Sequence, residues 1–314
     1  MRAEILSIGT ELLLGSILNT NARFLSQRLS ENAIDVYHEV VVGDNIARIA
    51  EAFRLAISRA DLVLSTGGLG PTEDDATLRG LALFLNRRLI LHQPTRQAVI
   101  SRLRSRGLRM TKLIERQCYL PEDPKFVFQN LKGTAPGVLY KIAAPAGKKW
   151  VLLLPGPPRE MEPLFTESTL PKILTLSGEK RGSFLVKSLR LADVAEFAVA
   201  QKITDLLKWK PPMTLGIYAT PGEVELKIMA KSGDPRSSRA LIQHAEIILR
   251  KRLGKWVYGV DGDTLSSSVG GLLQKKKLTL SAAESCTGGL LGHLLTENPG
   301  ASKYFWGSLT AYQN

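Results

Sequence analysis

The sequence predicts an α/β protein whose first domain is a mostly parallel sheet with helices on both faces. Three observations support this prediction. From Ala3 to about Gly178, short apolar segments alternate with segments of helical periodicity at the lengths of βαβ units. After Ser183 the order of segments changes, which indicates a smaller unit of α+β type. With 314 residues, the chain is also too long for one ordinary domain and suits two or three.

The first domain is expected to begin with an apolar strand at 3–9 and a helix over 19–31. Asn19 or Thr20 can cap this helix. The elements expected after it are a strand at 36–44, a helix through 49–57, a strand at 61–68, helices near 76–85 and 94–106, a strand at 148–156 and a helix that opens at 159. Strands and helices that alternate in this way form a sheet whose strands are mostly parallel.

The rest of the chain is expected to form two further parts, after a small polar linker at 177–183. The middle part has a strand, a helix at 193–207, two strands around Pro221–Gly222 and a second helix. The last part has a helix, a strand at 278–285 and a segment rich in small residues, and it is too short to bury a core of its own. The predicted domains are therefore 1–178, 183–261 and an incomplete α/β segment at 262–314.

The composition argues against several classes of protein. No apolar run approaches the roughly 18 residues of a membrane span, and Glu4 and Glu11 interrupt the apolar N-terminus, so we expect neither a membrane protein nor a signal peptide. Cys118 and Cys286 lie far apart without a CxxC motif, which favours reduced thiols and a cytoplasmic protein. The 4 histidines form no HExxH pair, so a histidine-built zinc site is not expected.

The net charge of +13 is the unusual global feature. Much of it lies between Arg96 and Arg116, in a segment that is either a nucleic-acid or polyphosphate surface or the solvated face of a helix. No aromatic residues that could stack on bases interleave with the basic ones. The solvated helix face is therefore the favoured interpretation, and a nucleic-acid partner is not.

The loop "STGGLGPTEDD" contains groups that can bind an anion and groups that repel one. Its glycines allow backbone N–H groups to approach a phosphate, whereas its three carboxylates would repel one. It is neither a GxGxxG fingerprint, since Glu73 stands at the third glycine position, nor a P-loop. A divalent cation held by the carboxylates would remove the repulsion.

Acidic residues also follow the neighbouring strands, whose carboxyl ends meet at one edge of a parallel sheet. These residues are Glu11, Asp44 and Glu160, besides Asp74 and Asp75 of the loop itself. The alternative is an ordinary helix start, with Thr72 as the cap and the acids in the first turn. The additional acids at neighbouring strand ends favour a metal–phosphate site.

Four motifs occur in order along the chain: "GTELLLG", "STGGLGPTEDD", "KGTAPG" and "LLLPGPPREM". Together they resemble the N-terminal domain of the competence/damage-inducible CinA family. The resemblance covers nearly the whole chain and implies a three-layer molybdopterin-binding-like fold, followed by a KH-like domain and the start of an amidase-like domain. It implies hydrolysis of ADP-ribose to AMP and ribose 5-phosphate in pyridine nucleotide salvage. The implied cofactors are a divalent metal ion, Co, Mg or Mn, with a possible role for potassium, and the implied assembly is a homodimer.

The same resemblance implies roles for individual residues. Asp75 and Asp74 are the catalytic acids, and Asp75, Asp44 and Glu11 are the metal ligands. The substrate-binding residues that it implies are Thr66, Gly67, Gly68, Gly70, Thr72, Gly133, Thr134, Pro155, Gly156 and Glu160.

The last segment, "AAESCTGGLLGHLL" with "GSLTAYQN", resembles the start of a nicotinamide mononucleotide deamidase domain. The resemblance implies Ser285 as the nucleophile and Tyr312 as its hydroxyl partner. A serine hydroxyl needs an adjacent base, and the lysine that supplies it in the family would follow the tyrosine, where this sequence stops at Asn314. We therefore expect no deamidase activity from this polypeptide.

The middle part resembles a KH-like domain, and RNA-binding KH domains clamp the backbone with a GXXG loop. No such sequence lies between the two helices expected here, so we predict a spacer or dimerisation element. Two other functions stay open for the whole chain. One is binding or adenylylation of molybdopterin, and the other is a non-enzymatic scaffold for DNA uptake or recombination.

Overall fold

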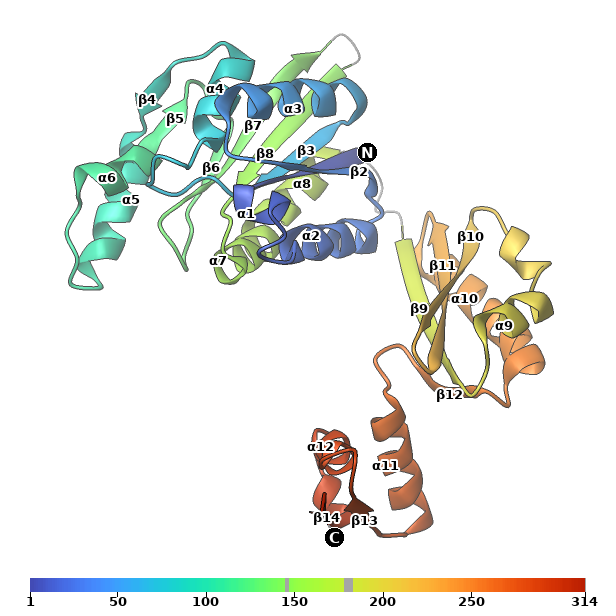
Figure 1. Cartoon of the computed structure of the whole chain (residues 1–314). Coiled ribbons are helices and arrows are strands. Elements are labelled where there is room, and N and C mark those ends of the chain that lie inside the picture. The colour runs from blue at the N-terminus through green and yellow to red at the C-terminus, as the bar shows by residue number, and fades with distance from the viewer. Residues whose placement is uncertain (145–146, 178–182, 314) are drawn as a thin grey trace. The chain divides into compact units, whose positions relative to one another are not determined.

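The structure of the chain is a computed structural model that describes residues 1–144, 147–177 and 183–313. The chain divides into two compact units, Met1–Gly182 and Ser183–Asn314 (Figure 1). The linker predicted at 177–183 and the domain end predicted at 178 fall mostly on 178–182, which lie outside the described residues.

The first unit is built on a six-stranded sheet in the order β2-β1-β3-β8-β7-β6. These strands are β1 (Arg2–Ile8), β2 (Asp35–Val42), β3 (Leu62–Thr66), β6 (Phe126–Phe128), β7 (Gly137–Ala144) and β8 (Gly147–Leu154). The pairs β1–β2, β1–β3 and β3–β8 are parallel, whereas β7 and β6 are added antiparallel. The prediction of a mixed α/β fold with a mostly parallel sheet is confirmed.

Helices cover both faces of this sheet (Figure 1). On one face lie α2 (Thr20–Glu31), α7 (Pro158–Pro163) and α8 (Leu170–Ser177), and on the other lie α3 (Ile46–Arg59) and α4 (Thr77–Leu85). Adjacent residues of one strand pack on opposite faces: Ile5 joins the core under α2, and Leu6 joins the core under α3. This burial on both sides explains why the central strands are apolar without alternation.

A segment between α4 and β7 forms a small substructure, of which the sequence pattern predicted only the helix near 94–106. It contains β4 (Leu89–Leu91), α5 (Gln93–Arg104), α6 (Lys112–Glu115) and β5 (Tyr119–Pro121), and β4 pairs antiparallel with β5. Its own core consists of Val99, Leu103 and Cys118. Burial raises the pKa of the Cys118 thiol to about 11, which keeps that thiol protonated at neutral pH.

The second unit contains an antiparallel sheet in the order β10-β11-β9-β12. Its strands are β9 (Ser183–Ala192), β10 (Met213–Thr220), β11 (Glu223–Ser232) and β12 (Val257–Val260), and α9 (Glu196–Lys202) and α10 (Pro235–Leu253) pack on it around one core. Helix α9 is shorter than the helix expected at 193–207. The Thr204 hydroxyl donates to the carbonyl of Ala200 (2.9 Å), a contact that competes with continued helix.

The C-terminal residues of this unit contain α11 (Leu265–Lys276), β13 (Leu280–Glu284), α12 (Leu290–Thr296) and β14 (Phe305–Thr310). Strands β13 and β14 pair in parallel, so their carboxyl ends lie at the same edge. Thr264 caps α11 by accepting a hydrogen bond from the amide of Ser267 (3.1 Å).

Candidate active site

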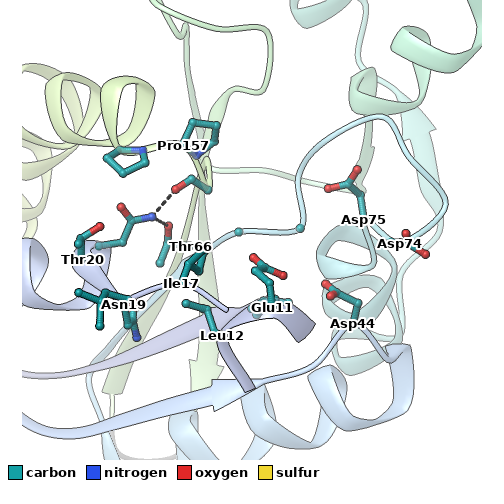
Figure 2. A pocket seen from close by; sticks show the side chains of 18 of the residues that line it. Glu11, Leu12, Ile17, Asn19, Thr20, Asp44, Thr66, Asp74, Asp75 and Pro157 are labelled. Atoms are coloured by element: carbon teal, nitrogen blue, oxygen red, sulfur yellow. Dashed lines mark hydrogen bonds between the residues drawn. The ribbon is translucent and has the colours of Figure 1, made fainter. Parts of the chain in front are cut away.

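The main candidate site is a cavity of about 430 Å³ at the carboxyl ends of β1, β2, β3 and β8 (Figure 2). It is lined by Ile8, Gly9, Glu11, Leu12, Ile17, Leu18, Asn19, Thr20, Asn21, Asp44, Thr66, Gly67, Gly68, Thr72, Asp74, Asp75, Gly156, Pro157 and Pro158. This is the position at which open α/β sheets bind their ligands. Helix α1 (Thr10–Leu13) and the start of α2 supply one wall.

Asp75 holds the shape of its own loop. Its Oδ1 accepts a hydrogen bond from the amide of Gly70 (2.7 Å), and its Oδ2 accepts from the amide (2.7 Å) and the hydroxyl (2.6 Å) of Thr72. A Cβ at position 70 would lie 2.5 Å from Oδ2 of Asp75, so a side chain there would displace the Asp75 carboxylate. Asp75 is thus a cap for the loop and a wall of the cavity at once.

The acids of this loop do not form the first turn of a helix. Helix α4 begins at Thr77, after Glu73, Asp74 and Asp75, and the residue at its N-cap position makes no side-chain capping bond. The alternative of an ordinary helix start with Thr72 as the cap is therefore wrong. The carboxylates belong to the loop that lines the cavity.

Asp44 joins two neighbouring loops. Its Oδ2 accepts from the amide (2.7 Å) and the hydroxyl (2.8 Å) of Thr10, and the Thr10 hydroxyl oxygen in turn accepts from the Asp44 amide (3.1 Å). Glu11 follows Thr10 directly, and Glu11 and Asp44 line the same cavity as Asp75 (Figure 2). Three predicted metal ligands therefore come from three loops at one edge of the sheet.

The glycines of the loop approach other backbone closely. Gly67 and Gly68 have φ of +100° and +61°, and a Cβ on Gly67 would lie 2.0 Å from the carbonyl oxygen of Ile8. The Thr66 hydroxyl donates to the carbonyl of Pro155 (2.8 Å), and a Cβ on Gly156 would lie 3.3 Å from the Cα of Gly67. The loops after β3 and β8 are thus in contact, and neither has room for a side chain at these glycines.

Asn21 is a site residue that sequence reasoning missed. Its Nδ2 donates to the hydroxyl oxygen of Thr66 (2.9 Å) and to the carbonyl of Gly156. The Thr66 proton is already used on Pro155, so both neighbours of Nδ2 are acceptors and the orientation of the amide is fixed. The Oδ1 of Asn21 is buried and accepts no hydrogen bond from the described part of the chain.

The donor chemistry of the cavity fits a hard cation. Carboxylate oxygens are the ligands that Mg²⁺ and similar ions take in proteins, and no hydrogen bond to the carboxylate of Glu11 or to Oδ1 of Asp44 occurs among the described residues. The described residues contain no group of three or more His, Cys, Asp or Glu side chains already close enough to hold a metal ion. Ligation by Glu11, Asp44 and Asp75 stays a prediction.

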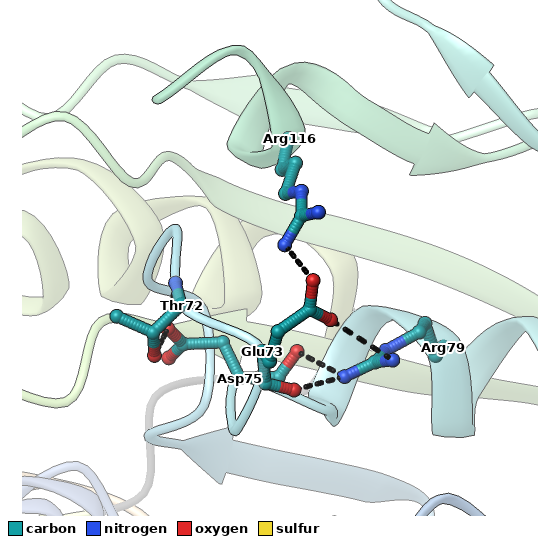
Figure 3. Close-up of polar contacts among 5 residues, drawn as sticks. All are labelled: Thr72, Glu73, Asp75, Arg79 and Arg116. Carbon is teal, nitrogen blue, oxygen red and sulfur yellow. Dashed lines mark hydrogen bonds and ion pairs between the residues drawn. The ribbon is translucent and has the colours of Figure 1, made fainter. Parts of the chain in front are cut away.

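The outer side of the loop is fixed by two arginines, as Figure 3 shows. Glu73 accepts from Arg116, and Arg79 donates to the carbonyls of Glu73 and Asp75, the latter at 3.4 Å. Glu73 is absent from the lining of the main cavity and instead lines a smaller one of about 250 Å³. These contacts leave Asp74 and Asp75, and not Glu73, to face the main cavity.

The remaining predicted residues lie elsewhere. Gly133 and Thr134 line a second cavity of about 480 Å³, together with Asn130. Glu160 lines neither of these two cavities, and its Oε2 accepts from Nδ2 of Asn130 (2.9 Å). Pro155 contributes a carbonyl to Thr66, and Gly70 lines the smaller cavity on the outer side of the loop.

Ser285 and Tyr312 follow the paired strands β13 and β14, so both lie at the same edge of that small sheet. Both side chains are exposed. The buried residue beside them is Glu284, which accepts from the amides of Leu291 (2.8 Å) and Gly292 (2.9 Å). Burial opposes ionisation of Glu284, but these hydrogen bonds outweigh it and lower the pKa of its carboxyl.

The fold and the site define a class of protein, an α/β domain of the molybdopterin-binding type. Residues 4–175 match the family described as a probable molybdopterin binding domain. Residues 186–259 match the KH domain of the damage-inducible protein CinA, and residues 262–314 match the CinA C-terminal domain. No helix among the described residues is long and apolar enough to cross a membrane.

Whole-chain relatives agree with these matches. A CinA-like protein of Dictyoglomus thermophilum is 43% identical over 314 residues, which cover all of this chain and 74% of that protein. A putative competence-damage inducible protein of Caldicellulosiruptor bescii is 41% identical over the same shares. The crystal structure of a CinA protein of unknown function from Thermoplasma acidophilum is 33% identical, with a TM-score of 0.50, over 55% of this chain and 99% of that one. The chain belongs to the CinA family.

Proposed function

We propose that the first unit hydrolyses the pyrophosphate bond of ADP-ribose, or of a related nucleoside diphosphate sugar, with the help of a divalent cation. The observation that supports this most is the meeting of Glu11, Asp44 and Asp75 with the backbone of Gly67 and Gly68 in one cavity. A glycine loop alone would suit any phosphate. Carboxylates beside it require a cation to offset their repulsion of that phosphate.

The chain's own residues bind and orient the substrate in this proposal. The backbone at Gly67 and Gly68 takes the pyrophosphate, because no side chain separates it from the cavity. Asp75 keeps the loop in its shape through Gly70 and Thr72, and Asp44 keeps the turn at Thr10 beside it. A cation bound by the carboxylates would lower the pKa of a water ligand and offset charge on the departing phosphate.

The direct test is to incubate the purified protein with ADP-ribose and follow the release of AMP by chromatography. We expect AMP with added Co²⁺, Mg²⁺ or Mn²⁺, no AMP after treatment with EDTA, and recovery when the metal is returned. Absence of cleavage with every divalent ion, combined with ADP-ribose binding that EDTA does not change, would refute the proposal.

Molybdopterin binding or adenylylation is the second candidate, and the description of the family that matches residues 4–175 favours it. The two candidates differ in their products. Adenylylation would transfer AMP from ATP to the pterin and release pyrophosphate, whereas hydrolysis uses water to release AMP and ribose 5-phosphate from ADP-ribose without ATP. Side-by-side incubations with the two substrate sets distinguish them.

Asn21 provides a further test of the cavity. Asn21→Ala removes the amide that ties Thr66 to Gly156 and the unpartnered acceptor Oδ1. We expect KM for ADP-ribose to rise about tenfold, since a hydrogen bond in such a site contributes on the order of 1 kcal/mol and two contacts are lost. Thr20→Ala, at the neighbouring position of the same wall, serves as the control and should change KM less. An unchanged KM for Asn21→Ala would remove Asn21 from the site.

A further inference from the structure

The second cavity, of about 480 Å³, lies between α5 and the segment that joins β6 to β7. Its walls combine polar and apolar side chains. The lining residues that carry polar side chains are His92, Thr95, Ser101, Arg102, Ser105, Gln129, Asn130 and Thr134, and apolar contacts come from Pro94, Ala98, Val99, Val127, Leu131 and Pro136. A cavity of this volume holds a small metabolite.

The wall of this cavity contains two basic residues, His92 and Arg102. Within the part of the chain that the structure describes, the guanidinium of Arg102 makes no hydrogen bond or ion pair, and its Nε is buried. Two other arginines of this segment are paired: Arg96 contacts Glu115 (2.6 Å), and Arg106 donates to the carbonyl of Lys132 (3.2 Å). A guanidinium has five N–H donors, and a buried charged donor without an acceptor is costly.

Glu160 does not neutralise Arg102 by contact. Its Oε2 is held by Asn130, and it lies so close to Gly133 that a Cβ there would be 1.5 Å from this oxygen. Burial, and next the charge of Arg106, lower the pKa of Arg102, although Glu160 acts in the opposite direction. The positive charge at Arg102 is therefore left without a close counter-charge from the described residues.

We propose that this cavity binds the phosphate group of a small phosphorylated sugar, with Arg102 as the main phosphate ligand. The planar guanidinium suits two parallel hydrogen bonds to phosphate oxygens. The side chains of Ser101, Gln129 and Thr134, which make no hydrogen bond with the described residues, suit the hydroxyl groups of a sugar. A nucleic-acid strand fits less well, because no Phe, Tyr or Trp lines the cavity for base stacking.

The test is a calorimetric titration of the full chain with ribose 5-phosphate, inorganic phosphate and neutral ribose. We expect the wild-type protein to bind the two phosphates and not ribose, and Arg102→Gln to weaken ribose 5-phosphate binding by about tenfold or more. Arg104→Gln, two positions along the same helix and exposed, is the matched control and should bind as the wild type does.

Two further variants keep the result interpretable. Arg102→Lys keeps the charge without the planar fork, so it should bind with intermediate affinity even if Arg102→Gln folds poorly. Asp75→Asn alters the main cavity and should leave the Arg102-dependent binding unchanged. Equal affinity of Arg102→Gln and wild type, or equal binding of ribose and ribose 5-phosphate, would overturn the proposal. So would duplex DNA binding that Arg102→Gln and Arg104→Gln weaken alike, with no binding of ribose 5-phosphate.

The phosphate belongs to a free phosphorylated sugar and not to a nucleotide bound in the main cavity, because ADP-ribose carries no terminal phosphate and the proposed function uses its pyrophosphate at Gly67 and Gly68. We therefore expect ADP-ribose and ribose 5-phosphate to bind at once, and Arg102→Gln to leave KM for ADP-ribose unchanged. Displacement of ribose 5-phosphate by ADP-ribose, with equal ribose 5-phosphate affinity in Arg102→Gln and wild type, would assign that ligand to the main cavity and overturn the proposal. The titrations need no turnover, so the site can stand even if the proposed hydrolysis fails.

Discussion

Replacing Asp75 with asparagine is expected to lower metal-dependent turnover of ADP-ribose by about 100-fold or more. The change removes a negative charge from the cavity and places an NH₂ group where a carboxylate oxygen now accepts hydrogen bonds. If that group replaces Oδ2, it faces the amide and the hydroxyl of Thr72. The metal site and the shape of the loop are weakened together. Steady-state kinetics at several metal concentrations measure the loss.

Asp74→Asn is the matched control, because it removes the same charge from the next residue in the lining of the same cavity. Asp74 makes no hydrogen bond with the described residues, so its loss should leave the loop in place and cost less activity. If the two variants lose activity equally, local charge and not the particular position of Asp75 is what matters. If Asp75→Asn turns over at the wild-type rate, the catalytic role of Asp75 is wrong.

The meeting of the acidic residues could be predicted because parallel topology determines which loops converge. Once 3–9, 36–44 and 61–68 are taken as parallel strands, their carboxyl ends must share an edge. Glu11, Asp44 and Asp75 follow those ends, and the structure places all three in one cavity. This prediction needs only short-range information, because each acidic residue lies close in sequence to the strand that positions it. For that reason the common location of these residues could be predicted.

Contacts between residues distant in the sequence could not be predicted in the same way. Asn21 reaches Thr66 and Gly156, which are 45 and 135 positions away, and no local pattern in α2 points to them. The segment that carries β4 to β6 has strands of only 3 residues, too short for an alternation of polar and apolar residues to be recognised. For that reason the sequence analysis assigned Gly133 and Thr134 to the same site as Asp75, whereas the structure places them in a different cavity.

Gly67→Ala is expected to be the most damaging small substitution in the loop after β3. At φ +100° an L-residue is strained, and its Cβ would lie 2.0 Å from the carbonyl oxygen of Ile8, on the neighbouring strand. The conformational strain and the clash with backbone together should lower the free energy of unfolding by about 2–5 kcal/mol. Urea denaturation measures this loss, and turnover of ADP-ribose should fall to background because the phosphate loop must move.

Gly107→Ala separates the two causes. Gly107 has a similar positive φ of +71°, but nothing lies within 4 Å of the Cβ that alanine would add. It should therefore cost only the conformational part, about 1–2 kcal/mol, and leave turnover unchanged because Gly107 is outside the lining of the main cavity. An equal loss of stability in the two variants would mean that the contact between Gly67 and Ile8 relaxes without cost. In that case the loop after β3, which is proposed to bind phosphate, would adjust its backbone more readily than its close packing indicates.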